Sequence, residues 1–295
     1  MQSALDVLSQ IRGFEHPDRL EPARGLSNRV FFLTTGGEEY VFRLANAHAE
    51  QLGISRQAEE RALRVARQAG IGPDVVHYVQ PQGHLLTRRI RGRPFADDPA
   101  RYWEPETLRS IVRVVRRVHA LPPLDHAFDP FARIRTSFSR AAERAVSLPA
   151  KSDRVLDRLA AIETARDPLA PQGRVFCHND LFAGNILDAE PIRLIDWEFA
   201  GTGDAFFDLA TLAVATDEST PLPRELRRVI LDEYFGRVDP SYEKRLDDMI
   251  FVVRLHVVAW GLTHHVLGTP DSNGWPGFTF LGFATELLAG LISEP

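Results

Sequence analysis

The apolar positions in the first 90 residues follow two spacings, one of two residues and one of three to four. Alternation of apolar and polar residues indicates strands, and the pair Gly36-Gly37 separates two of these runs. Two glycines between β-prone runs predict a hairpin. The runs predicted as strands are 20–23, 29–34, 39–44, 75–79 and 85–90. Together they predict a five-stranded antiparallel sheet.

Helical spacing marks one main segment before residue 90, at 55–68, which Gly70 ends. Beyond residue 90, helical spacing dominates the chain. The segments predicted as helices are 104–120, 131–146, 153–162, 205–215, 223–235, 242–267 and 278–292. We therefore predict an α+β fold with two lobes. Residues 1–90 form the N-lobe with its sheet and one main helix, and residues 91–295 form a mostly helical C-lobe.

Composition and charge narrow the class of partners. The 295 residues are 44% hydrophobic, which predicts a large buried core, and the net charge of −5 argues against nucleic acid or an anionic membrane as the main partner.

The single cysteine, Cys177, excludes an internal disulfide, and the first residues lack the pattern of a signal peptide, so we expect a cytoplasmic protein. The apolar segment 249–262 is interrupted by Arg254 and His256 and is too short to cross a bilayer, which predicts a buried helix and no membrane partner.

One segment carries the polar residues most typical of catalysis. Two short apolar strands, 174–177 and 192–195, each lead into polar residues; Asp180 and Asn185 lie between them and Asp196 follows the second. Phosphoryl transfer uses one carboxylate to orient and deprotonate a hydroxyl, and an amide and a second carboxylate to hold Mg²⁺ against nucleotide phosphates. The three residues fit these roles in that order, with Asp180 as the base and Asn185 and Asp196 as Mg²⁺ ligands.

Each half of this pattern is weak by itself, because His-X-Asp is common and Asp-Trp-Glu also occurs in turns. His178, which we group with Asp180 in the catalytic loop, is either a metal ligand or a structural residue. The adjacent Cys177 is the only other imidazole or thiol at ligand spacing. We therefore favour a hydrogen bond from His178 that fixes the loop.

The run His-Asn-Asp-Leu-Phe-Ala-Gly-Asn-Ile-Leu at 178–187, followed by Leu-Ile-Asp-Trp-Glu-Phe-Ala-Gly at 194–201, resembles a family of small-molecule kinases. This is the aminoglycoside phosphotransferase and choline/ethanolamine kinase superfamily, which shares the protein-kinase-like fold. The resemblance implies that fold in its bilobal form, with ATP as phosphate donor and Mg²⁺ as cofactor. The Asp-Trp-Glu run is most similar to that of the choline, ethanolamine and thiamine kinases.

The resemblance also assigns nucleotide-binding residues in the N-lobe. Gly25, Ser27 and Asn28 occupy the turn that covers the phosphates. The chain has no lysine before residue 151, so Arg43 takes the place of the phosphate-binding lysine, and Glu59 is its ion-pair partner. The alternative for Arg43 is a solvent-facing strand residue.

By position alone, the backbone near Arg88 and Arg89 is where adenine would bind, at the hinge between the lobes.

The acceptor is predicted to be a small molecule. Asp208 follows Asp196 by only twelve positions, too few for a peptide-docking segment, and no Ala-Pro-Glu motif follows. The resemblance places Trp260 and Phe199 as aromatic walls around a cation, and Glu198 at the metal, the cation or both. Thr263 stands where the family has a second tryptophan, and Trp260 is alternatively a core residue of its helix.

These residues favour an acceptor such as choline or ethanolamine. Thiamine, an aminoglycoside or a sugar is the alternative, and a catalytically silent nucleotide-binding relative is a third reading. The sequence does not predict an oligomeric state.

Overall fold

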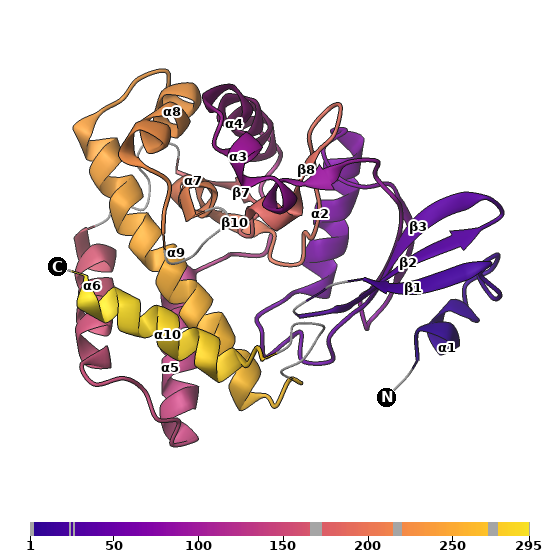
Figure 1. The fold of residues 1–295 in the computed structure, drawn as a ribbon, viewed down its shortest axis with the longest axis horizontal. Coiled ribbons are helices and arrows are strands. Elements are labelled where there is room, and N and C mark those ends of the chain that lie inside the picture. Colours follow the sequence, from indigo (N-terminus) through magenta and orange to yellow (C-terminus); the bar gives the residue numbers. More distant parts are fainter. Residues whose placement is uncertain are drawn as a thin grey trace.

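The computed structural model describes residues 3–23, 25, 27–165, 173–214, 220–270 and 277–294. A twisted sheet and a set of helices lie side by side in it (Figure 1). The sheet is antiparallel with strand order β1-β2-β3-β5-β4, as predicted. The elements of this N-terminal part are α1 (Ala4–Leu8), β1 (Arg19–Ala23), β2 (Arg29–Thr35), β3 (Glu38–Leu44), α2 (Arg56–Gln68), β4 (Val75–Val79) and β5 (His84–Arg88).

Local sequence explains how these elements begin and end. Gly36 and Gly37 both have positive φ, 58° and 78°, which suits the two-residue hairpin turn between β2 and β3. Ser55 caps α2 by accepting the N–H of Ala58. The apolar face of α2 packs into the main hydrophobic core of the molecule. As a result, the polar side of β3 and the start of α2 both face the catalytic segment.

The rest of the chain is mainly helical, as predicted. Its elements are β6 (Arg93–Pro94), η1 (Phe95–Asp97), α3 (Pro99–Tyr102), α4 (Pro105–His119), α5 (Pro130–Glu143), α6 (Ser152–Ala165), β7 (Arg174–Cys177), η2 (Ala183–Asn185), β8 (Ile186–Asp188), β9 (Arg193–Leu194), β10 (Gly201–Asp204), α7 (Ala205–Val214), α8 (Arg224–Phe235), α9 (Pro240–Val266) and α10 (Phe280–Ser293). The predicted strand 192–195 is shorter than expected, since β9 covers only Arg193–Leu194; the N–H of Ile195 still donates to the carbonyl of Asn185, in register with β8.

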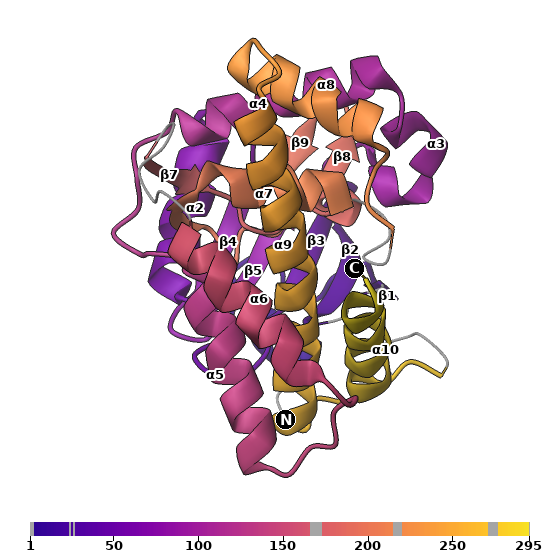
Figure 2. The same cartoon turned by 90° about the vertical axis from the view of Figure 1, so that its left-hand side faces the viewer.

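Helix α9 runs through the middle of the C-lobe, with α5 and α10 packed along it (Figure 2). It is longer than the predicted apolar segment. By length and composition alone, its 27 residues would be enough to cross a membrane, but 78% of its most apolar stretch is buried inside the molecule. The polar residues that interrupt it are also used internally: Arg254 pairs with Glu294, and His256 packs edge-on to Phe128 and Phe207. α9 is therefore a core helix.

Two small sheets hold the catalytic segment. β7 pairs with β10, and β8 pairs with both β6 and β9, all antiparallel. The loop between β7 and η2 thus leaves from one of these small sheets, and the turn after β9 leaves from the other. Trp197, fully buried in that turn, donates to the carbonyl of Leu194 and anchors it in the core.

Candidate active site

Asp180 and Asn185 lie in the loop after β7 and contact each other. Asn185 Nδ2 donates to Asp180 Oδ2 at 2.7 Å and to the Asp180 carbonyl oxygen at 2.9 Å. These bonds orient the carboxylate and leave the amide oxygen of Asn185 as its available ligand atom. Asn179 has a φ of 64°, a left-handed conformation that asparagine tolerates well. Its Nδ2 donates to the carbonyl of Phe199 at 3.0 Å, which ties the loop to the segment after Asp196.

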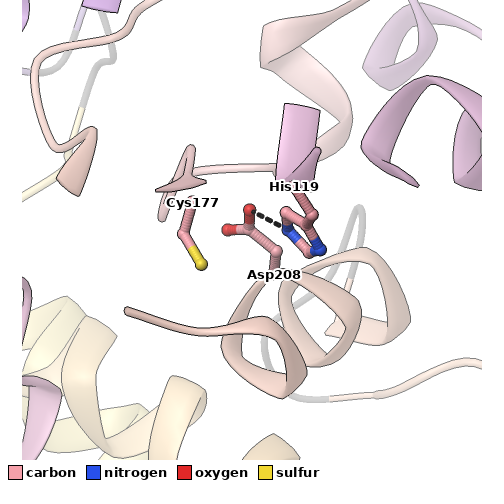
Figure 3. Close-up of side chains that lie close together, drawn as sticks. All are labelled: His119, Cys177 and Asp208. Atoms are coloured by element: carbon pink, nitrogen blue, oxygen red, sulfur yellow. Dashed lines mark hydrogen bonds and ion pairs between the residues drawn. The ribbon is translucent and has the colours of Figure 1, made fainter. Parts of the chain in front are cut away.

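Asp208, on α7, supports this loop. Its carboxylate accepts the backbone N–H groups of His178 and Asn179, at 2.8 and 2.7 Å. It also lies 3.0 Å from His119 Nε2, and Figure 3 shows the pair with Cys177 beside it. Burial raises the pKa of the Cys177 thiol well above its usual range, so the thiol stays protonated. Because the Asp208 carboxylate holds two backbone N–H groups of the loop and contacts His119, we assign this cluster as a brace for the loop.

Asp196 follows β9 in a turn where its φ is 62°. His178 fixes this turn, since its Nε2–H donates to the carbonyl of Ile195 at 3.0 Å and its ring lies 4.4 Å from that of Trp197. Burial lowers the pKa of His178 to about 4, so its imidazole is neutral at physiological pH. His178 thus makes the kind of structural hydrogen bond that the sequence predicted for it.

Asp180, Asp196 and Glu198 form a group of carboxylates that repel one another. Burial, followed by repulsion from the other two carboxylates, raises the pKa of Asp180 well above its usual range. Burial and Glu198 raise the pKa of Asp196 to about 7, although Arg43 acts in the opposite direction. A bound cation would relieve this repulsion, and the oxygens of Asn185 and Asp196 are the ligand type that Mg²⁺ prefers. The residues present therefore fit the predicted Mg²⁺ site.

Arg43, on β3, lies at the centre of a buried ion network. Its Nη2 pairs with Glu59 and donates to the carbonyl of Gly83 at 3.0 Å. Its Nη1 lies 3.2 Å from Asp196 Oδ1 and 3.4 Å from Glu198 Oε2. The ion pair with Glu59 implied by the resemblance is present. Arg43 is 6% exposed, so the side chain does not face solvent.

A second arginine, Arg56, joins the same network. It donates to Glu59 at 2.8 Å and to Glu198 at 3.2 Å, and the hydroxyl of Tyr78 donates to Glu59 at 2.6 Å. Burial opposes ionisation of Glu59, but Arg43 and Arg56 outweigh it and lower its pKa. Glu198 is thus directed at cationic groups of the N-lobe.

The turn predicted to cover the phosphates is tied to both lobes. Asn28 Nδ2 donates to Glu198 at 3.0 Å, and Ser27 Oγ lies 3.5 Å from His264 Nε2 on α9. At Gly25, an added Cβ would lie 2.5 Å from the carbonyl oxygen of Asn28. Only glycine fits there without a shift of the turn.

Arg88 and Arg89 do not join this group. Their exposed side chains pair with Glu38 and Glu39, each at 2.9 Å. Their N–H groups donate to the carbonyls of Asp74 and Glu39. The N–H groups of both residues are therefore already satisfied, by the sheet and by the residue before β4.

A cavity of about 230 Å³ lies between α5, α9 and residues 50–53. Trp260, which is half-buried, and Phe199 both line it, so one cavity has both predicted aromatic walls. One face of Phe199 is covered, because Arg133 Cζ lies 5.5 Å from the centre of its ring. Thr263 also lines the cavity, and its hydroxyl lies 2.7 Å from that of Ser137.

Residues 19–245 match the family model of the phosphotransferase enzyme family. This chain belongs to that family. Among curated proteins, it is 27% identical over 227 residues to protein LicA of Haemophilus influenzae; the alignment covers 75% of this chain and 63% of LicA, so the chain spans less than two thirds of that relative.

Solved structures confirm the bilobal α+β fold predicted for this phosphotransferase. A choline/ethanolamine kinase family protein from Mesorhizobium loti superposes with a TM-score of 0.77 at 24% identity, covering 99% of this chain and 94% of the other. Choline kinase LicA from Streptococcus pneumoniae superposes with a TM-score of 0.69 at 19% identity, covering 98% and 97%. At these identities the two structures establish the fold alone.

Two residues of the phosphotransferase site were missed from sequence. Arg56 was not predicted as a site residue, because its contact with Glu198, 142 positions away, has no local signal. Arg133 lies in an arginine-rich amphipathic helix, where charged residues usually face solvent. Only the packing of α5 against residues 50–53 brings it to the cavity.

Proposed function

We propose that this phosphotransferase is an ATP-dependent kinase that moves the γ-phosphate to a hydroxyl group of a small molecule. The proposal rests on one observation: Asp180, Asn185 and Asp196 converge beside the buried pair of Arg43 and Glu59. Mutually repelling carboxylates destabilise a fold, so their grouping is typical of a functional site. This argues against a silent nucleotide-binding relative.

Asp180 is the proposed general base. Asn185 holds its carboxylate in place, and the raised pKa of Asp180 makes it a better proton acceptor. The acceptor hydroxyl gives its proton to Asp180 while its oxygen attacks the γ-phosphorus, and ADP leaves with the electron pair of the broken bond. The neutral His178 keeps the loop and the Asp196 turn together throughout.

We propose Asn185 and Asp196 as the ligands of Mg²⁺, which, when bound, neutralises charge on the β- and γ-phosphate oxygens. Arg43 adds a fixed positive charge on the N-lobe side, held by Glu59. The backbone of the turn from Gly25 to Asn28 faces the phosphates.

The adenine contacts are proposed for the backbone near Arg88 and Arg89.

The proposed acceptor site is the cavity lined by Trp260 and Phe199. Phe199 connects it to the catalytic loop, since its carbonyl accepts a hydrogen bond from Asn179. Choline or ethanolamine is the acceptor favoured by the sequence, and the names of the similar kinases support it. Glu198, predicted at the metal, the cation or both, is not among the residues that line this cavity; it lies beside Asp196 and Arg43, so we propose it for the metal side of the site. Thiamine, an aminoglycoside or a sugar is the alternative.

We also propose that residues 1–90 form the N-lobe and residues 91–295 form the C-lobe. A cytoplasmic location is proposed because the single cysteine is a free, buried thiol.

The experiment that tests the kinase proposal is ADP release from Mg²⁺-ATP in the presence of amino alcohols, thiamine, aminoglycosides and sugars. We expect at least one compound to stimulate ADP release over the acceptor-free rate in the wild-type protein and not in Asp180→Asn. If no acceptor stimulates ADP release, or if Asp180→Asn responds as the wild type does, the kinase proposal is wrong.

A further inference from the structure

The charges that line the cavity differ from those expected around a cation. Its charged side chains are Arg133, Arg140 and Glu50, and Glu50 is exposed at the rim. A site for a quaternary ammonium uses aromatic faces together with carboxylates. This cavity has two guanidinium groups and one exposed carboxylate instead.

Arg133 is the charge closest to the cavity's aromatic wall. Its guanidinium carbon lies 4.6 Å from the ring centre of Phe128 and 5.5 Å from that of Phe199. Its Nη atoms donate to the carbonyls of Leu52 and Gly53, which fixes the group in place. Within the described part of the chain, no carboxylate forms an ion pair with Arg133, so its charge is not neutralised locally. The protein's own cation thus already lies over one face of Phe199.

Arg133 does not lose this charge by deprotonation at physiological pH. Burial lowers the pKa of Arg133 to about 10, which still leaves it charged near neutrality. Burial, followed by the charge of Arg133, lowers the pKa of His256 to about 3, so the neighbouring imidazole is neutral. Asp129 is the carboxylate whose charge acts on Arg133, and the rings of Phe128 and Phe207 pack against His256.

His256 offers a hydrogen-bonding group to an uncharged ligand. Its ring lies edge-on to Phe128 and Phe207, each at 5.6 Å, and its Nδ1 is buried without a hydrogen-bond partner among the described residues. A buried polar atom without a partner costs stability unless a water or a ligand satisfies it. A hydroxyl group can either donate to this nitrogen or accept from it.

We propose that Arg133 determines acceptor specificity and that the acceptor alcohol carries no positive charge in this cavity, with His256 binding one of its polar uncharged groups. The proposal rests on the kinase function proposed above and narrows its substrate class. It replaces choline and ethanolamine, which the sequence and the names of the similar kinases favour, with the sugar alternative and with polyols and hydroxy acids.

A matched pair of alcohols tests the charge directly. Choline is compared with its carbon isostere, in which a tert-butyl group replaces the trimethylammonium, and ethanolamine is compared with ethylene glycol and glycolate. We expect kcat/KM to be at least about tenfold higher for each uncharged or anionic compound than for its cationic partner, equivalent to about 1.4 kcal/mol. Equal or higher kcat/KM for choline or ethanolamine overturns the inference but leaves the kinase function intact. Failure of every compound in a wider alcohol panel overturns the kinase function instead.

Variants of Arg133 assign the effect to this residue. In Arg133→Gln, the kcat/KM for the carbon isostere divided by that for choline should fall several-fold. Arg133→Lys keeps the positive charge and should retain the wild-type ratio. Because the ratio is taken within one variant, a general loss of folded protein cancels. Arg135→Gln on the same helix is the control, since Arg135 is exposed and pairs with Glu163. An unchanged kcat/KM ratio in a folded Arg133→Gln variant, or an equal fall of that ratio in Arg135→Gln, refutes the role of Arg133. If Arg133→Gln does not fold, the isostere-to-choline ratio of the wild-type protein decides whether the acceptor is uncharged.

Discussion

Replacement of Arg43 is expected to damage nucleotide binding more than acceptor binding. The planar guanidinium contacts four acceptors in different directions: Glu59, Asp196, Glu198 and the carbonyl of Gly83. Lysine keeps the charge but presents its donors from a single atom on a flexible stem. Arg43→Lys should therefore retain part of this network, and Arg43→Gln should lose its charge completely.

The buried contacts of Arg43 set the size of the expected effects on stability and on the KM for ATP. Removing one partner of a buried ion pair typically costs about 3–5 kcal/mol, because the other charges stay buried without compensation. We expect a loss of this size in the free energy of unfolding for Arg43→Gln. Each lost hydrogen bond to a charged group costs about 1.5–3 kcal/mol, so the KM for ATP should rise about 10- to 100-fold in Arg43→Lys.

The assay combines thermal unfolding with KM values for ATP and for the acceptor. Arg29→Gln, on the neighbouring strand and exposed, is the matched control. A KM for ATP that rises while the acceptor KM changes by less than about threefold supports the account, since that change corresponds to under 1 kcal/mol. Equal changes in both KM values, or none in a folded variant, would remove Arg43 from the nucleotide site.

Three further predictions concern separate parts of the site. The apparent affinity for Mg²⁺-ATP should decrease as the pH falls through about 7, because Asp196 then takes up a proton. Asp196→Asn should weaken Mg²⁺-ATP binding at every pH and flatten this pH dependence. A wild-type affinity that does not change with pH would contradict the assignment of Asp196 as a Mg²⁺ ligand. Gly25→Ala should raise the KM for ATP about tenfold, because the new Cβ would clash with the carbonyl of Asn28 and move the turn. A tenfold change corresponds to a loss of about 1.4 kcal/mol in binding free energy. An unchanged KM for ATP would exclude the turn from nucleotide binding. Trp260→Ala should raise the acceptor KM with little change for ATP, and a collapsed melting temperature with loss of both activities would show a purely structural role.

The sequence predicted the parts of the site that lie within continuous segments. The alternation of apolar and polar residues along β2 and β3, with Gly36 and Gly37 between them, was sufficient to predict this hairpin of the sheet. Asp180 and Asn185 contact each other because five positions of one loop separate them. Arg43 and Glu59 were paired through the family resemblance, since propensity alone says nothing about partners on different elements.

Contacts between distant elements were not predictable. Arg133 has the same local pattern as Arg135, yet the first lies at the cavity and the second is exposed, because helix spacing turns them to different faces. The extent of α9 was predicted to within two residues, as 242–267 against Pro240–Val266, but the internal partners of its charged residues were not. Once folded, charged residues such as Arg254 are paired inside the lobe, which a sequence window cannot anticipate.

Phosphorus NMR of the reaction products tests the central claim most directly. Wild-type protein with Mg²⁺-ATP and an accepted alcohol should produce equal amounts of ADP and a new phosphate monoester. Asp180→Asn should produce neither above background while still binding the nucleotide, because the missing base acts on the acceptor hydroxyl. Formation of the monoester by Asp180→Asn at the wild-type rate, or release of inorganic phosphate in its place by the wild-type protein, would contradict the account.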